Sequence, residues 1–190
     1  MPKVGMQPIR TSALVQAVID EIGETGTMDV TVSQIARRAG MSSGLVHHYF
    51  GSKDNMFIAT ARSILRKFSD EVRANLQGQA DPRERLETII RTSFSEVNKH
   101  PETVGVWLNL YVYAQKSHEV AHLLTIYRAR MRSNLLHELR QLRPDQAEVI
   151  AEAIAAHIDG TYIRWGLHDA KTRTATPEQN ALDSLALLLG

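Results

Sequence analysis

Two groups of histidines in this chain of 190 residues have a spacing that could support chemistry. His118, Glu119 and His122 satisfy the pattern H-E-x-x-H, in which two histidines one helical turn apart bind zinc and the glutamate acts as a base. Glu138 is a conceivable distant third ligand. The glycine and third histidine that extend the pattern in one class of zinc proteases are missing here, and a solvated polar turn explains the residues equally well. We therefore expect no metal site, no cofactor and no catalysis, with a zinc-dependent hydrolase as a remote alternative.

The second group, His47 and His48, lies in residues 31–50, which have the pattern of two short helices joined by a tight turn. Thr31 can cap the first helix, and Gln34 is placed three residues later to complete a capping box. Gly40 can adopt the left-handed conformation that ends a helix, and Ser42 can cap the next one. This spacing is that of a helix-turn-helix and predicts nucleic acid as a partner.

The second of these helices has side chains that could contact DNA. Val46 and Phe50 are four residues apart and can pack inward. The residues left on or near the outward face are Ser43, Gly44, His47 and His48. Their hydroxyl and imidazole groups could meet base edges or phosphates, and Leu45 could contact a thymine methyl group if it faces outward. The alternative is a compact helical hairpin with histidines at its edge.

Residues 51–54 begin another capped helix and place Lys53 at its N-terminus, where a phosphate is favoured. With this continuation, the segment resembles the DNA-binding region of the TetR family of one-component regulators. The family pattern of T, IA, AG, S, G, YF and K is matched by Thr31, Ile35, Ala36, Ala39, Gly40, Ser42, Gly44, Tyr49, Phe50 and Lys53. Residues 1–10 are also similar to the start of one branch of the family, the betaine-operon repressors called BetI.

The resemblance implies a repressor of the genes for glycine betaine synthesis and choline transport, which binds palindromic double-stranded operator DNA as a homodimer. Choline or another quaternary ammonium is the implied effector, and a TetR-type regulator of efflux or of another catabolic operon is the alternative. Carried onto this sequence, the family pattern assigns base reading to Ser43, Leu45 and His47, and phosphate contacts to Thr31, His48, Tyr49 and Lys53, with Ser42 and Gly44 in the same DNA-binding set. His47 departs from the tyrosine common at its position, which leaves its base preference open.

Aromatic residues gather in the second half of the chain, where both tryptophans and four of the five tyrosines lie beyond residue 106. Trp107 and Tyr111 share a helical face, as do Asp159 and Tyr162, so two helices could supply rings and one carboxylate to a common pocket. Such a site suits a quaternary ammonium. Filling of the core is the alternative, but the resemblance to choline-responsive repressors adds weight to a cage of Trp107, Tyr111, Asp159, Tyr162 and Trp165.

The composition is that of an ordinary globular protein, with 43% hydrophobic residues and no cysteine. The net charge is only +1, so a case for DNA binding must rest on local charge. Residues 1–67 contain eight lysines and arginines against five acidic residues, a modest bias of +3. No signal peptide opens the chain, and no stretch approaches the roughly 18 apolar residues that span a bilayer. The cytoplasm is therefore the expected location.

Every long segment has the periodicity of a helix, which predicts an all-α fold of the TetR type. The helices outside residues 31–50 are expected at 8–23, 52–76, 82–99, 101–115, 117–141, 144–168 and 177–189. We place the domain boundary near Gly51, between a three-helix DNA-binding domain (1–51) and a helical effector-binding and dimerisation domain (52–190).

Apolar stripes on the last two helices, through Ile154 and Ile158 and through Leu182 and Leu185, have the spacing of core packing. The TetR resemblance favours their use in a four-helix dimer interface. Such a dimer would set two recognition helices about 34 to 36 Å apart, the separation of successive major grooves.

Overall fold

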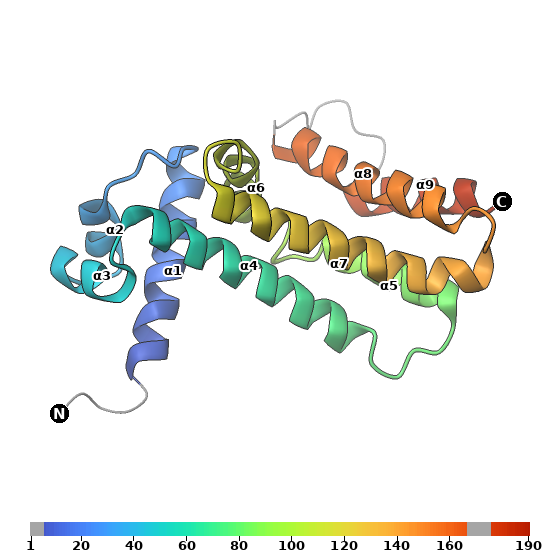
Figure 1. Ribbon diagram of the computed structural model, residues 1–190, viewed down its shortest axis with the longest axis horizontal. Helices are drawn as coiled ribbons and strands as arrows, with labels where there is room; N and C mark the ends of the chain where they lie inside the picture. The colour runs from blue at the N-terminus through green and yellow to red at the C-terminus, as the bar shows by residue number, and fades with distance from the viewer. Residues whose placement is uncertain (1–5, 167–175) are drawn as a thin grey trace. The chain divides into compact units, whose positions relative to one another are not determined.

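The computed structural model describes residues 6–166 and 176–190, in which all regular structure is helical (Figure 1). The helices are α1 (Met6–Thr25), α2 (Val32–Arg38), α3 (Ser43–Phe50), α4 (Lys53–Asn75), α5 (Pro82–Ser93), α6 (Pro101–Tyr113), α7 (His118–Leu142), α8 (Ala147–Gly166) and α9 (Pro177–Leu189). No strand occurs among the described residues, and the predicted all-α fold is confirmed. None of the helices in this part of the chain is long and apolar enough to cross a membrane.

The helix predicted over residues 82–99 is wrong at its C-terminal end, because α5 stops at Ser93. Phe94 leaves the helical conformation with φ −115° and ψ 26°, and its side chain is buried. The side-chain amide of Asn98 then donates to the carbonyl oxygen of Thr92 at 2.8 Å, which holds the chain in a turn. The other predicted helices end within three residues of the observed bounds, except that residues 167–168 lie outside the described residues.

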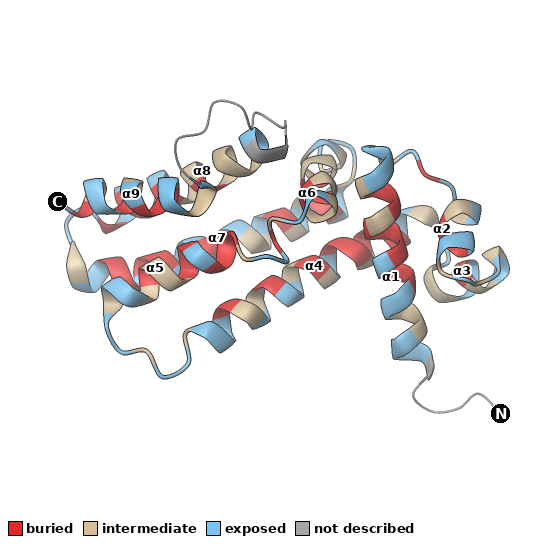
Figure 2. Ribbon diagram, turned by 180° about the vertical axis from the view of Figure 1, so that it is seen from behind, coloured by how far each residue is buried: buried red, intermediate tan, exposed pale blue. Residues whose placement is uncertain are grey.

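Packing divides the chain into two compact units, Met1–Leu65 with Pro101–Ala121, and Arg66–His100 with His122–Gly190. In the first unit α1 packs against α2 and α6, and α2 packs against α3. One side of α1 is buried between residues 14 and 22, whereas the N-terminal part of the helix is exposed or half-buried (Figure 2). Leu14, Val18 and Ile22 of α1 are at most 1% exposed. This grouping by packing differs from the functional boundary at residue 51, which stays a prediction.

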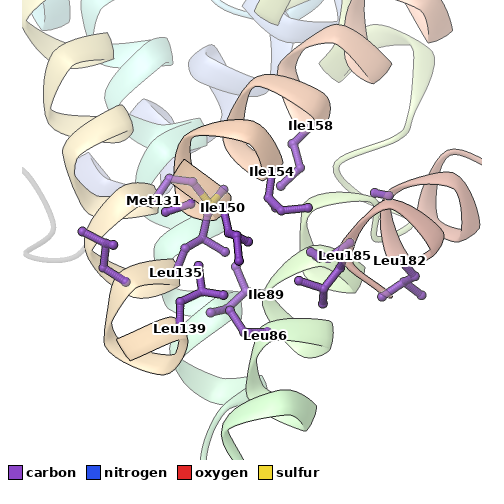
Figure 3. Packing of buried hydrophobic residues seen from close by; sticks show 14 of the residues in the cluster. Leu86, Ile89, Met131, Leu135, Leu139, Ile150, Ile154, Ile158, Leu182 and Leu185 are labelled. Carbon is purple, nitrogen blue, oxygen red and sulfur yellow. The ribbon is translucent and has the colours of Figure 1, made fainter. Parts of the chain in front are cut away.

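The second unit has its own core, built from α5, α7, α8, α9 and the second half of α4. Leu86 and Ile89 of α5 lie close to Leu135 and Leu139 of α7, with the isoleucines of α8 above them (Figure 3). Most of the two apolar stripes noted on the last helices face this core, because Ala151, Ile154, Ile158, Leu182, Leu185 and Leu189 are all buried. Among the side chains of α8 and α9 that the structure describes, the large apolar ones that remain exposed are Val149, Ile163 and Leu187.

A buried ion pair joins α5 to α7 in the second unit. Arg85 Nε lies 2.6 Å from Glu138 Oε1, and the Glu138 side chain is only 2% exposed. Arg85 also donates to the carbonyl oxygens of Leu76 and Gln79, at 3.3 and 3.1 Å, just beyond the end of α4. Glu138 thus stabilises the packing of α5 against α7, because its carboxylate forms an ion pair with Arg85.

Candidate nucleic-acid interface and effector cavity

The first helix of the helix-turn-helix is fixed by its own capping residues. The Thr31 backbone N–H donates to Gln34 Oε1 at 2.7 Å, and the Gln34 backbone N–H donates to Thr31 Oγ1 at 3.2 Å, which confirms the predicted capping box. The chain leaves α2 through Gly40, whose φ of 64° lies in the left-handed region that favours glycine. Because these signals are local in sequence, the turn could be predicted without the structure.

Helix α3 has one buried side and one exposed side. Ser42 is its N-cap, with Oγ accepting from the Leu45 backbone N–H at 3.2 Å. Val46 is buried and Phe50 half-buried, as predicted, whereas Gly44, His47 and His48 are exposed and Ser43, Leu45 and Tyr49 are half-buried. A Cβ atom on Gly44 would meet no atom within 4 Å, so the fold itself does not require glycine there. The position leaves room for the close approach of an external partner.

Lys53 stands at the start of α4, beside the end of α3. The preceding Ser52 caps the helix, with Oγ accepting from the Asn55 backbone N–H at 3.1 Å. Lys53 Nζ lies 3.7 Å from Asp29 Oδ1 and 5.6 Å from the centre of the Phe57 ring. Asp29 is 96% exposed, and an ion pair with so exposed a partner contributes little. The ammonium group can therefore exchange this partner for a phosphate at little cost.

The two neighbouring arginines of α2 have different surroundings. Arg38 donates to the carboxylates of Glu21 and Glu24 on α1, and the Glu21 side chain is largely buried. The hydrogen bond to Glu21, followed by that to Glu24, raises the pKa of Arg38 above its ordinary value. Arg37 is exposed. Both arginines reach solvent, but Arg38 is also paired with α1 and therefore holds α2 against that helix.

The residues predicted to form an aromatic cage fall into different units of the structure. Trp107 and Tyr111 lie on α6 in the first unit, with ring centres 6.2 Å apart. Asp159 and Tyr162 lie on α8 in the second unit. Trp165 also belongs to α8, but its side chain lies outside the described residues. A cage made of all five side chains therefore stays a prediction.

Tyr162 has a structural position in the second unit. Its hydroxyl group contacts the carbonyl oxygens of Ser93 and Asn98, at 2.5 and 3.1 Å. Its ring stacks on Phe94 with centres 5.5 Å apart. Burial, and then the neighbouring Tyr127, raise the pKa of the Tyr162 hydroxyl, which stays a hydrogen-bond donor. The side chain thus fastens α8 to the turn that ends α5.

A cavity of about 480 Å³ lies between α7 and α8, within the second unit. Its lining includes Tyr127, Arg128 and Met131 from α7, and Glu152, Ala155 and Asp159 from α8. Burial is the main cause that raises the pKa of Tyr127, and the carboxylate of Asp159 raises it further. The sequence had placed Tyr127 only in the general group of aromatic residues. The sequence does not show that Tyr127 lines the same cavity as Asp159, because the two residues are 32 positions apart on different helices.

His118 and His122 are exposed in the first turns of α7, as is Glu119. In residues 6–166 and 176–190, no three histidine, cysteine, aspartate or glutamate side chains are grouped to hold a metal ion. Glu138, the conceivable third ligand, pairs with Arg85 instead. The described residues around the H-E-x-x-H pattern therefore offer no third ligand for a zinc ion.

Two family models match the chain. Residues 14–60 match the model described as bacterial regulatory proteins, tetR family, and residues 82–190 match the model described as BetI-type transcriptional repressor, C-terminal. The HTH-type transcriptional regulator BetI of Rhizobium meliloti is 54% identical over 171 residues, which cover 90% of this chain and 84% of the relative. The protein of the same name from Agrobacterium fabrum is 49% identical, over 90% of this chain and 83% of the relative.

Solved structures share the fold. A transcriptional regulator from a Rhodococcus species superposes with a TM-score of 0.84 at 24% identity, covering 94% of this chain and 95% of the other. A putative transcriptional regulator from Saccharomonospora viridis, in complex with choline, gives a TM-score of 0.81 at 20% identity, with 94% of each chain covered. At these identities the likeness establishes the fold alone.

Proposed function

Because this chain belongs to the TetR family of bacterial regulators and ends in the domain of the BetI-type repressors, we propose that it controls genes for choline uptake and glycine betaine synthesis in response to choline. It is a DNA-binding transcriptional repressor and not an enzyme. The observation that carries the proposal is the exposed side of α3, next to the capped start of α4 with Lys53.

Helix α3 is the recognition helix, which lies in the major groove of the operator. Ser43, Leu45 and His47 read base edges from this helix, and the missing side chain at Gly44 lets the backbone come close to DNA. Ser42 begins α3 and stays beside the phosphates. Ser42 Oγ already accepts from the Leu45 N–H, so this hydroxyl group has a partner within the protein as well.

Phosphate contacts come from Lys53, His48, Tyr49 and Thr31. The N-terminus of α4 attracts a phosphate through its free N–H groups, and Lys53 adds a full positive charge at the same place. The rings of His48 and Tyr49 contact each other edge to face, with centres 5.7 Å apart, which restricts the motion of both. The Thr31 hydroxyl lies 2.7 Å from Gln34 Oε1, so its contact to DNA requires an exchange of this partner.

A second copy of the chain pairs through α8 and α9. Val149 and Leu187 are 73% and 84% exposed, which is unusual for large apolar side chains on helices that otherwise pack well. Burying them against the same residues of a second copy would remove this apolar surface from water. The resulting homodimer presents two copies of α3 to a palindromic operator.

The effector binds in the cavity between α7 and α8. The ring of Tyr127 offers cation-π attraction to a trimethylammonium group, and Asp159 supplies the opposite charge. A cavity of about 480 Å³ is large enough for choline. The predicted cage thus keeps Asp159 and gains Tyr127, while Trp107 and Tyr111 stay candidates on α6. Choline need only bind more tightly to a dimer conformation that no longer matches the operator.

Binding of the purified protein to DNA from upstream of choline-pathway genes tests this function. Fluorescence anisotropy should show tight binding to a palindromic segment, and choline should lower the affinity. A panel of larger drug-like cations and neutral ligands separates the proposal from a regulator of efflux. Release by the drug-like cations without any response to choline would contradict the choline assignment while leaving DNA binding intact.

A further inference from the structure

The end of α6 is fastened to the beginning of α4 by one tyrosine. The hydroxyl group of Tyr113, the last residue of α6, donates a hydrogen bond to Asp54 Oδ1. The Tyr113 ring also meets the buried Phe57 ring edge to face, with centres 5.8 Å apart. All three residues belong to the first unit, and Asp54 directly follows Lys53.

Phe57 connects this contact to Lys53. Lys53 and Phe57 are one helical turn apart, so they lie on the same face of α4, and Lys53 Nζ stands 5.6 Å from the centre of the Phe57 ring. Tyr113 therefore contacts two residues of α4 near Lys53: Asp54, the next residue in the chain, through its hydroxyl, and Phe57, whose ring lies near the ammonium group, through its ring. Other contacts hold α6 in the same unit, such as Asn109 Nδ2, which donates to the carbonyl oxygen of Gly26 at 3.2 Å.

The position of Asp54 creates an electrostatic problem for DNA binding. Asp54 lies in the first turn of α4, where a carboxylate is attracted to the same free N–H groups that would attract a phosphate. An unrestrained Asp54 side chain would occupy this place and repel the DNA backbone. In the structure, the Asp54 carboxylate instead accepts a hydrogen bond from the Tyr113 hydroxyl group. A neutral donor thus binds the negative charge that would otherwise compete with a phosphate for the helix terminus. Burial, and then the bond to Asp54, raise the pKa of Tyr113 to about 12, so the hydroxyl keeps its proton.

We propose that Tyr113 is a positioning residue for operator binding, which holds the Asp54 carboxylate away from the phosphate that Lys53 and the start of α4 bind. The inference rests on the proposed function, because it needs a DNA phosphate at this helix terminus. It adds a residue of α6, outside the helix-turn-helix, to the set that determines operator affinity.

The test compares operator affinities of Tyr113→Phe, Asp54→Asn and the double variant by fluorescence anisotropy. Tyr113→Phe keeps the ring packing but releases the carboxylate, and we expect it to weaken binding about three- to tenfold. Asp54→Asn keeps an acceptor for Tyr113 and removes the charge, so it should bind at least as tightly as the native protein. In the double variant no charge remains to be held, and its affinity should equal that of Asp54→Asn. High salt should reduce the defect of Tyr113→Phe, since salt screens the repulsion.

Two results would overturn the proposal. One is equal weakening by Tyr113→Phe in the native and Asp54→Asn backgrounds, which would assign the tyrosine to packing alone. The other is weaker binding by Asp54→Asn itself, which remains decisive even if Tyr113→Phe fails to fold. Asp70→Asn, an exposed acid sixteen residues later on α4, controls for the loss of one negative charge.

Lys53→Ala separates this inference from the proposed function. It should weaken binding to every sequence alike and lower the slope of log affinity against log salt by about one unit. If Lys53→Ala binds like the native protein, the phosphate contact itself fails. If Lys53→Ala binds the operator more weakly but Tyr113→Phe does not, the phosphate contact of Lys53 stands and only the proposed role of Tyr113 is wrong.

Discussion

We propose that single residues on the exposed side of α3 determine which DNA sequence the protein prefers. His47 is exposed there and stands where the family usually has tyrosine. An imidazole can donate a hydrogen bond to a base edge, or accept one from it, at one position of the operator. A contact to phosphate does not depend on which base is present. We therefore expect a change at His47 to alter how strongly affinity depends on the operator sequence, and not only the overall affinity.

We expect His47→Ala to lower the affinity for the best operator by about 1 to 3 kcal/mol and to relax the preference at one base pair. Quantitative footprinting across a set of single-base operator variants measures both effects. His48→Ala is the matched control, because its predicted contact is to phosphate and its loss should be equal for all variants. A uniform loss for His47→Ala as well would remove His47 from base reading.

Arg38 has the opposite role, since its partners lie within the protein. Its guanidinium pairs with the largely buried Glu21 and with Glu24, and these bonds hold α2 against α1. Arg38→Ala would leave the Glu21 carboxylate without this partner, and we expect a loss of about 2 kcal/mol in the free energy of unfolding. Arg37→Ala, next to it but exposed, should change this free energy by less than about 0.5 kcal/mol. Urea unfolding of both variants checks the difference, and equal losses would contradict it.

Whole helices were predictable where their ends are set by nearby residues. The helix ends near residues 31–42 are determined by residues no more than four positions away, namely Thr31 with Gln34, Gly40 and Ser42. These ends could therefore be predicted from the sequence. Residues 94–99 contain no glycine or proline to interrupt the periodic pattern, so the sequence predicts that the helix continues there. The hydroxyl group of Tyr162 donates to the carbonyl oxygen of Ser93, 69 positions earlier in the chain, where this turn begins. A contact between residues so far apart cannot be predicted from their spacing in the sequence.

The same limit applies to the candidate site. The DNA-binding side of α3 lies within one short helix, so its exposed residues could be chosen from periodicity. The cavity proposed for the effector combines α7 with α8, and it is lined by Asp159 together with Tyr127. Tyr162, chosen from its spacing to Asp159, has its hydroxyl engaged with backbone carbonyls.

The turn after α5 gives a test at the scale of the helix. The Asn98 side chain is 5% exposed and donates to Thr92 O, Ser95 Oγ and Glu71 Oε2 at 2.8 to 3.2 Å. Asn98→Ala removes these three bonds of a buried side chain, which should cost about 2 to 3 kcal/mol of unfolding free energy. Asn134→Ala, on the exposed side of α7, should have little effect. Denaturant unfolding measures both, and similar values for the two variants would show that Asn98 does not hold the turn.

For the whole molecule, DNA binding cannot come from overall charge, because the formal net charge is only +1. Affinity must depend on how a few charges are placed, such as Lys53 at a helix terminus and Asp54 held by Tyr113. When affinity depends on a few placed charges, a small change in geometry is enough to lower it. A modest difference in effector affinity between two conformations is then sufficient for regulation.

The location of the effector decides how this regulation begins. If choline binds beside Tyr127 and Asp159, then Asp159→Asn should raise the choline concentration needed for half-release of the operator about tenfold, with little change in operator affinity without choline. Glu152→Gln, an exposed acid on the rim of the same cavity, is the control for charge and should have a smaller effect. Anisotropy titrations with choline compare these variants with Trp107→Ala. Loss of the response in Trp107→Ala but not in Asp159→Asn would move the effector to α6, and an unchanged response in both would exclude both candidate sites.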